Sequence, residues 1–324
     1  GVQPSKLFYN ISCFRYEKPQ SGRLRAFHQF GIETFGTSDM AADAEIIATV
    51  IDCFNEIGIK DFQIEIGQID YFKGLVAESG ISEEEEDQIK EYIHIKNFFG
   101  LEEYVDALDI SDSLKKAFSS FDSLFGGVAM LDTAESYVSN ETSLEAVKRL
   151  RRVYEALECY GYEKHISFDL GMLDGYNYYT GIIFRGYTYG TGDAVVKGGR
   201  YNNLLKQFGK DAPSIGFAFT VEELIMAMNR QNIKIHVEYS NTIILYNIEE
   251  QDKAIKTGMK LRSEGCKIEL IRKSQKKSIE DYLEYARREH FSGLIYFDQK
   301  ELAVAYDVIN KTNSMWDGES YSIK

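Results

Sequence analysis

The 324-residue sequence lacks several features that mark common classes of protein. Its four cysteines are widely spaced and contain no Cys-x-x-Cys pair, so we expect neither a zinc site nor a disulfide framework. It has no run of about eighteen apolar residues and no charged-then-apolar leader, which predicts neither a membrane span nor a signal peptide. We therefore expect free thiols in a cytoplasmic protein that holds no metal.

Basic charge is also scarce. The chain carries 37 lysines and arginines against 51 aspartates and glutamates, a net charge of −14. General nucleic-acid binding draws its affinity from neutralising phosphates, so this balance argues against that function. One basic cluster is more typical of a solvated face than of an RNA contact: Arg272, Lys273, Lys276, Lys277, Arg287 and Arg288.

The apolar pattern predicts a sheet in the first part of the chain. Two strand-like runs, "KLFYNISCFRY" and "FHQFGIETFG", are joined by a polar loop within residues 6–36. A helix is predicted over 38–59, capped by Ser38 or Asp39. Further strands are expected at 62–67, 165–171, 176–190, 193–199 and "SIGFAFT", the last running into the helix "VEELIMAMNRQ".

Two segments depart from this sheet pattern. Residues 69–158 are acidic and helical in pattern, and Ser82 before four glutamates predicts a capped helix start rather than a metal site. Residues 236–324 alternate strand and helix patterns. We therefore expect an α+β fold: an antiparallel sheet with helices over 1–235, a helical insertion over 69–158 and a small α/β domain over 236–324.

Polar side chains share one face of the strand near residue 30. Alternate residues of a strand point to opposite faces, so Gln29 and Glu33 lie on one face with Gly31 between them. Gly31 has no side chain, which predicts a notch between an amide and a carboxylate. Arg15, on the preceding strand, lies near it in some registers. Such groups suit the charged ends of an amino acid; the alternative is a structural ion pair on a half-exposed sheet.

Tyrosines gather in a second stretch, "YNYYTGIIFRGYTYG", and in "GGRY". Tyr179 and Gly181 share a face of the predicted strand, which leaves room beside an aromatic ring. Rigid tyrosines around a gap fit a flat ligand such as an imidazole or adenine, although 22 tyrosines make aromatic strands common in any case. "KGGR" lacks the spacing and the ending of a phosphate loop, and we predict no cofactor.

Four motifs, in order, resemble class II histidyl-tRNA synthetases. "FRYEKPQSGRLRAFHQFGIETFG" looks like their motif 2, "YNYYTGIIF" like their second histidine-specific motif, "GGRY" like the segment after it, and "GFAFTVEEL" like motif 3. The resemblance covers residues 6–230. It implies the class II fold, which is usually dimeric, and the tail is weakly similar to the family's anticodon-binding domain.

Some functional positions of the synthetases have matching residues in this sequence, and others do not. Two synthetase arginines that would face ATP phosphates are replaced by acids, Asp174 and Glu223. A reversal of charge about 4 Å from a phosphate, at an effective dielectric near 20, is worth up to roughly 8 kcal/mol, which implies a large loss of adenylate formation. Six residues match positions that hold the substrate in the synthetases, and they form the implied histidine pocket: Arg15, Gln29, Glu33, Tyr178, Tyr179 and Tyr201.

The chain is also similar to the regulatory subunits of ATP phosphoribosyltransferase, a family of synthetase paralogues, most clearly in "LGMLDGYNYYTGIIFRGYTYG". That family implies a non-catalytic homodimer within a hetero-oligomer. Its partner is the short-form catalytic subunit, which joins ATP to phosphoribosyl pyrophosphate in the first step of histidine biosynthesis, and its effector is L-histidine, the feedback inhibitor. A working histidyl-tRNA synthetase and a synthetase-like module for another ligand are the alternatives.

The resemblance departs from the family ahead of motif 2. The family has a motif 1 dimer helix and a threonine-bearing strand of the histidine pocket there, and neither occurs in this sequence, which starts at Gly1 rather than Met. We expect the natural start to lie upstream. Dimerisation and a complete pocket depend on that segment.

Overall fold

The computed structural model describes residues 5–16, 25–173, 178–235, 241–297 and 303–316. The chain divides into two compact units, Gly1–Lys234 and Ile235–Lys324, which are described separately.

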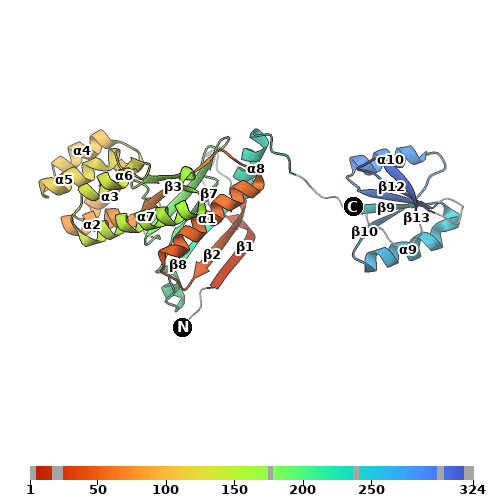
Figure 1. The fold of residues 1–324 in the computed structure, drawn as a ribbon, viewed down its shortest axis with the longest axis horizontal. Helices are drawn as coiled ribbons and strands as arrows, with labels where there is room; N and C mark the ends of the chain where they lie inside the picture. The colour runs from red at the N-terminus through yellow and green to blue at the C-terminus, as the bar shows by residue number, and fades with distance from the viewer. Residues whose placement is uncertain (1–4, 17–24, 174–177, 236–240, 298–302, 317–324) are drawn as a thin grey trace. The chain divides into compact units, whose positions relative to one another are not determined.

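An eight-stranded sheet forms the centre of the N-terminal unit (Figure 1), in the order β1-β2-β8-β7-β6-β3-β5-β4. Its neighbouring strands are antiparallel except for β3 and β5, which run parallel, so the sheet is mixed rather than purely antiparallel as the sequence suggested. The strands are β1 (Ser5–Phe14), β2 (Ala26–Phe35), β3 (Phe62–Gln68), β4 (Phe125–Gly126), β5 (Ile166–Asp169), β6 (Ile182–Thr188), β7 (Val196–Arg200) and β8 (Ser214–Thr220).

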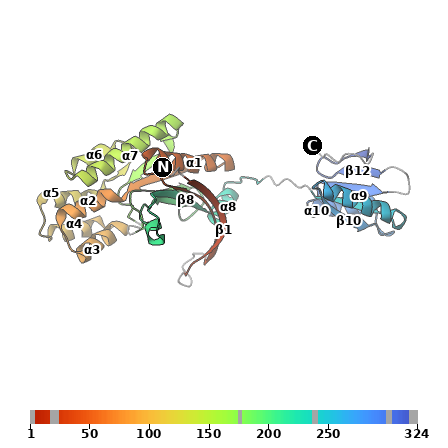
Figure 2. The ribbon, with the colours of Figure 1, turned by 90° about the horizontal axis from the view of Figure 1, so that it is seen from below.

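Helices α1 (Met40–Ile57) and α7 (Glu141–Tyr160) cover one face of this sheet (Figures 1 and 2). The side chain of Asp39 caps α1 by accepting a hydrogen bond from Ala41 N, as the sequence predicted. Phe54 of α1 is fully buried and packs edge-on against Phe219, which stacks on Phe30 of β2. The face that carries Phe30 is therefore the core face, and the face that carries Gln29 and Glu33 points away from α1.

The insertion is helical, as predicted, and its helices gather at one end of the sheet (Figures 1 and 2). Ser82 and Glu85 form the expected capping box at the start of α3. Only the two-residue strand β4 breaks the pattern among the described residues of 69–158, because two residues are too few to show alternation. Besides α7, the helices are α2 (Ile69–Ser79), α3 (Glu83–His94), α4 (Phe98–Asp106), α5 (Asp112–Ser119) and α6 (Met130–Ser136).

Helix α8 (Val221–Arg230) follows β8 directly. Glu222 in its first turn accepts hydrogen bonds from the backbone N of His28, at 3.0 and 3.1 Å, and this ties the start of α8 to β2. Short 3₁₀ turns connect other elements: η1 (Ser120–Asp122), η2 (Glu163–His165), η3 (Leu204–Phe208) and η4 (Ile248–Glu250).

The C-terminal unit has a five-stranded sheet in the order β10-β9-β11-β12-β13. The first three strands are parallel, which is typical of the α/β domain that the sequence predicted, and the last two are antiparallel additions that the sequence did not predict. Its elements are β9 (Asn241–Tyr246), α9 (Gln251–Ser263), β10 (Lys267–Arg272), α10 (Ile279–Arg288), β11 (Gly293–Phe297), β12 (Ala303–Asp307) and β13 (Thr312–Trp316).

Several side chains of the basic cluster in this unit contact residues close to them in sequence. Arg287 pairs with Glu280 at 3.0 Å and Arg288 with Glu289 at 2.9 Å, while Lys277 lies over the ring of Tyr282.

In neither unit do the described residues contain a helix long and apolar enough to cross a membrane.

Candidate functional site

A row of glycines forms the floor of a site on the open face of the N-terminal sheet. The register places Glu33 of β2 beside Gly216 of β8, and Gly216 beside Gly199 of β7. A Cβ at Gly216 would overlap the Glu33 carboxylate, and a Cβ at Gly199 would come within 2.7 Å of the Tyr179 ring. The side chains of Glu33 and Tyr179 therefore lie flat across strands that have no side chains of their own at these positions.

Four of the six predicted ligand residues converge above this floor. Tyr201 Oη donates a hydrogen bond to Glu33 Oε2. The ring of Tyr178 stacks on Tyr201, with centroids 5.2 Å apart, and meets Tyr179 edge-on at 4.9 Å. Tyr201 is buried, whereas 43% of Tyr178 is exposed, so the cluster opens to solvent on the side of Tyr178.

The two neighbouring tyrosines do not lie on a strand, which corrects the sequence analysis. Strand β6 begins at Ile182, so Tyr178 and Tyr179 belong to the segment before it. Gly181 lies along the aliphatic part of Arg200, with its ideal Cβ 3.4 Å from Arg200 Cδ, rather than beside an aromatic ring. The glycine that makes room for Tyr179 is Gly199.

Tyr9 belongs to the site and was missed from the sequence. The register pairs Tyr9 of β1 with Gly31, and an ideal Cβ on Gly31 would lie 2.8 Å from Tyr9 Oη. The notch that the sequence predicted between Gln29 and Glu33 is therefore filled by this phenol. Burial and the nearby Glu33 carboxylate raise the pKa of Tyr9 to about 12. Only the strand register, which the sequence left open, could have revealed it.

The cluster is a half-buried carboxylate surrounded by protonated phenols. Burial raises the pKa of Glu33, and the hydrogen bond from Tyr201 opposes that rise. Burial, followed by Glu33, raises the pKa of Tyr179 to about 12, and the pKa of Tyr201 rises for the same reasons. Among the residues that the structure describes, no cationic side chain forms an ion pair with Glu33. The site therefore offers a negative charge and flat aromatic walls to a cationic ligand.

Arg15 and Gln29 face a neighbouring cavity of about 880 Å³ instead of the Glu33 cluster. The register sets Gln29 opposite Ile11 and Glu33 opposite Leu7, while Arg15 follows the end of β1 and bonds to Arg25 through the backbone. The Arg15 guanidinium lies 4.7 Å from the centre of the Phe27 ring. Gln29 Oε1 accepts a hydrogen bond from Cys13 Sγ at 3.3 Å. The structure thus separates the predicted residues into two adjoining groups.

Glu223 lines the same cavity as Arg15 and Gln29. It lies in the first turn of α8, and its Oε2 atom is buried with no hydrogen-bond partner in the described part of the chain. The acid that the resemblance sets in place of a synthetase arginine therefore lines the cavity. Asp174, with residues 175–177, lies outside the described residues. No cluster of three or more His, Cys, Asp or Glu side chains suited to a metal ion occurs in the ranges described.

Known proteins match the chain over most of its length. The family model described as histidyl-tRNA synthetase matches residues 1–224. The ATP phosphoribosyltransferase regulatory subunit of Acetivibrio thermocellus is 39% identical over 83% of this chain and 65% of its own length. The protein of the same name from Thermoanaerobacter pseudethanolicus is 37% identical over 87% of this chain and 74% of its own length.

Two solved structures share the fold. The crystal structure of an ATP phosphoribosyltransferase regulatory subunit/histidyl-tRNA synthetase from Bacillus halodurans has a TM-score of 0.74 and 28% identity, covering 91% of this chain and 74% of its own. Histidyl-tRNA synthetase from Nostoc sp. has a TM-score of 0.73 at 20% identity, covering 96% and 75%, and shows the fold alone. With its class II fold and these relatives, the chain belongs to the family of ATP phosphoribosyltransferase regulatory subunits.

Proposed function

We propose that this protein is a non-catalytic regulatory subunit that binds L-histidine and transmits feedback inhibition to a short-form ATP phosphoribosyltransferase. The observation that carries the proposal is the Glu33 cluster, an anionic group without an ion-pair partner in the described ranges, walled by Tyr9, Tyr178, Tyr179 and Tyr201. The imidazole of histidine is flat, and its ring N–H can donate to the Glu33 carboxylate.

The amide of Gln29 suits the other end of the same amino acid. Gln29 lies four residues from Glu33 on the same face of β2, about 13 Å along the strand, with the Tyr9 ring between their Cα atoms. A histidine bound at Glu33 directs its ammonium and carboxylate groups toward Gln29 and the mouth of the cavity. Arg15 lies a further four residue levels along, out of reach of a histidine bound at Glu33, and lines the adjoining cavity together with Gln29.

Loss of synthetase chemistry is part of the proposal. Adenylate formation requires cationic groups around the phosphates of ATP, and the cavity-lining residue Glu223 stands where the resemblance expects a synthetase arginine. A carboxylate there repels ATP phosphates. The protein would therefore retain histidine binding and use it as a signal.

Regulation follows from linkage. If histidine binds one conformation of the complex more tightly, it shifts the complex toward that conformation by the difference in binding free energy. The catalytic subunit then responds to a ligand that binds only the regulatory subunit. No reaction on this chain is required.

The test is the activity of a short-form ATP phosphoribosyltransferase measured with and without this protein across a histidine titration. We expect this protein to raise the rate and histidine to reverse the increase. Glu33→Gln should still activate but respond to about 10- to 100-fold more histidine, because a hydrogen bond to a charged group is lost. Glu102→Gln, on the exposed side of α4, is the matched control and should behave as the wild type.

Absence of any effect on rate and on histidine sensitivity would refute the regulatory proposal. In that case histidine-dependent exchange between pyrophosphate and ATP becomes the decisive measurement. Exchange would identify a working synthetase. Lack of exchange together with lack of histidine binding would identify a synthetase-like module for another ligand.

A further inference from the structure

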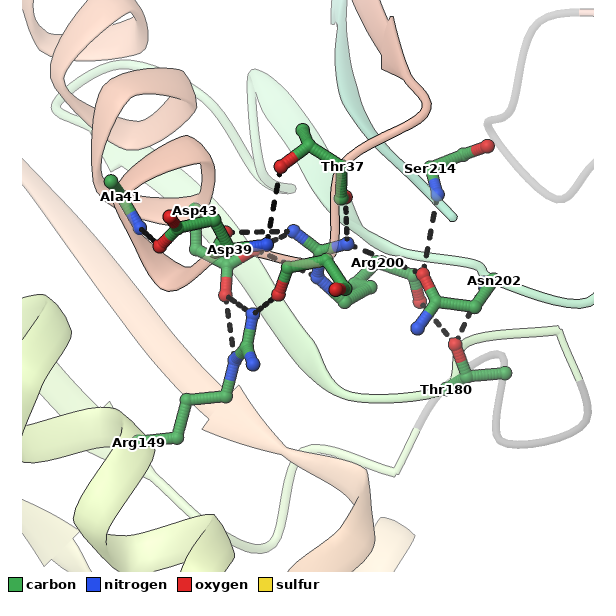
Figure 3. A network of polar contacts seen from close by, with 10 residues as sticks. Thr37, Asp39, Ala41, Asp43, Arg149, Thr180, Arg200, Asn202 and Ser214 are labelled. Atoms are coloured by element: carbon green, nitrogen blue, oxygen red, sulfur yellow. Dashed lines mark hydrogen bonds and ion pairs between the residues drawn. The ribbon is translucent and has the colours of Figure 1, made fainter. Parts of the chain in front are cut away.

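A fully buried carboxylate lies behind the tyrosine cluster, between two arginines (Figure 3). Arg200 Nε donates to Oδ1 of Asp43 at 2.8 Å, and Arg149 Nε donates to Oδ2 at 2.7 Å. Each guanidinium therefore takes one carboxylate oxygen. Burial raises the pKa of Asp43, and the two arginines oppose that rise. Asp43 lies on α1, Arg200 ends β7 and Arg149 lies on α7, so the three residues join three elements.

Arg200 fixes the backbone next to the site tyrosines from the core side of the sheet. It directly precedes Tyr201, and its carbonyl oxygen accepts a hydrogen bond from Thr180 N at 2.7 Å. Its Nη1 atom donates to Thr37 O at 2.8 Å and to Asn202 Oδ1 at 3.2 Å. Asn202 N in turn donates to Thr180 Oγ1 at 2.8 Å (Figure 3). The residues adjoining Tyr201 and Tyr179 are therefore fixed by bonds that converge on Arg200.

Arg149 brings the helical insertion into this arrangement. It also donates to Ser38 O at 3.0 Å, just before α1. Arg151, two residues further along α7, is equally exposed, 29% against 28%, but pairs with Asp132 and Glu135 of α6. Of these two arginines, Arg149 bonds to the core behind the ligand site and Arg151 bonds within the insertion.

Stability alone is a weak explanation for this arrangement. Taking charged groups out of water costs several kcal/mol each. Replacing them with apolar side chains of similar volume often leaves a protein equally stable or more stable. What the charges add is direction, because a guanidinium and a carboxylate fix each other's orientation. Here the residue whose orientation is fixed is Arg200, which directly precedes Tyr201.

We infer that Asp43, Arg200 and Arg149 form a positioning triad, which sets Tyr201 and Tyr179 for the ligand and makes the affinity of the site depend on the position of α7. The inference rests on the proposed histidine pocket and adds a route for its regulation. A partner that moves α7 against α1 changes histidine affinity, and by reciprocity histidine changes the affinity for that partner. The three residues are positioning residues and do not touch the ligand.

The first test compares two arginines of the same helix. Arg149→Met should weaken histidine binding, measured by calorimetry, by about 2- to 30-fold, the range usual for residues that couple to a site without touching its ligand. Arg151→Met should leave the affinity unchanged. Arg149→Lys keeps the charge but loses the forked geometry, and should fall between Arg149→Met and the wild type. Asp43→Asn is avoided because it leaves two arginines without their anionic partner and threatens folding.

The second test reads Tyr201 directly and does not need histidine. In protein labelled with 3-fluorotyrosine, the fluorine signal of Tyr201, assigned by its loss in Tyr201→Phe, should shift in Arg149→Met and not in Arg151→Met. Equal responses to both variants, or a response to neither, would overturn the inference. A selective Tyr201 response in a protein that does not bind histidine would refute the proposed function and leave the positioning role standing.

Discussion

Glu33 combines two properties that rarely occur together at a purely structural position. It is half-buried, which disfavours its charge, and its neighbours are phenols rather than cations. Tyr201 can donate one hydrogen bond to it, which leaves most of the acceptor capacity of the carboxylate unused. Such a group lowers the folding free energy gain when it is ionised. A cationic ligand that binds to it offsets this cost.

The raised pKa of Glu33 predicts how stability depends on pH. The unfolded chain has a glutamate pKa of about 4.3, and the folded state binds that proton more tightly. The contribution of Glu33 to stability is therefore fully present below the unfolded pKa and is lost as pH rises through the folded pKa. Glu33→Gln removes this loss, so the variant should be at least as stable as the wild type at neutral pH.

Urea unfolding midpoints measured across pH check this prediction. The advantage of Glu33→Gln should shrink as pH falls through the raised folded pKa of Glu33, and it should vanish below the unfolded pKa of about 4.3, where Glu33 is neutral in both states. The amide oxygen of the introduced glutamine can still accept the hydrogen bond from Tyr201, so the fold is kept. A variant that is less stable than the wild type at every pH would show that the carboxylate is structural.

At the scale of elements, β7 and the segment before β6 form a tightly fitted pair. Gly199 lies under the Tyr179 ring, and Gly181 lies along Arg200, which bonds to Asp43 on the core side. The same strand therefore presents one face to the proposed ligand site and the other to the proposed positioning triad. Side chains of any size at Gly199 compete with the aromatic wall of the site.

Substitutions at the two glycines should separate these roles. In Gly199→Ala the new Cβ lies 2.7 Å from the Tyr179 ring and 2.8 Å from the carbonyl oxygen of Ile182. We therefore expect the free energy of unfolding to fall by about 1–3 kcal/mol and histidine binding to weaken. Gly181→Ala is the control, because its Cβ lies 3.4 Å from Arg200 Cδ, an ordinary van der Waals distance that requires no atom to move. Denaturant midpoints and calorimetry measure both effects. Equal effects from the two changes would contradict the assigned packing.

At the scale of the whole molecule, each unit has apolar cores of its own. The core of the N-terminal unit includes Ile47, Phe54 and Phe219, whereas the sheet of the C-terminal unit has one cluster around Ile243 and another around Ile244. The Glu33 cluster and the positioning triad both lie within the N-terminal unit. Ligand-linked stability should therefore appear in the unfolding of that unit.

Histidine should stabilise the folded protein by mass action. At a free concentration of about 100 times Kd, a ligand that binds only the folded state adds about 2.7 kcal/mol to the free energy of unfolding. Far-ultraviolet ellipticity during denaturant unfolding, with and without L-histidine, measures this increase. The Glu33→Gln variant should gain much less at the same concentration, and an equal gain would place histidine elsewhere.

The sequence by itself determined the elements and their approximate order. Periodicity located α1, the helical insertion and the parallel part of the C-terminal sheet, and local chemistry located the caps at Asp39 and Ser82. It also identified Glu33, Tyr178, Tyr179 and Tyr201 as candidates, because motif resemblance is a property of the chain alone. These features depend on residues close in sequence, so no long-range contact was needed to find them.

Only the tertiary structure decided which of these residues meet. The register of β1 against β2 put Tyr9 over Gly31 and set Arg15 apart from Glu33, since a shift of register changes every cross-strand neighbour. The pairing of Asp43 with Arg200 and Arg149 joins residues 157 and 106 positions apart, and no local pattern marks it. The strands β12 and β13 are only five residues each, so pairing of β12 with β11 and of β13 with β12, rather than their own sequence, makes them strands.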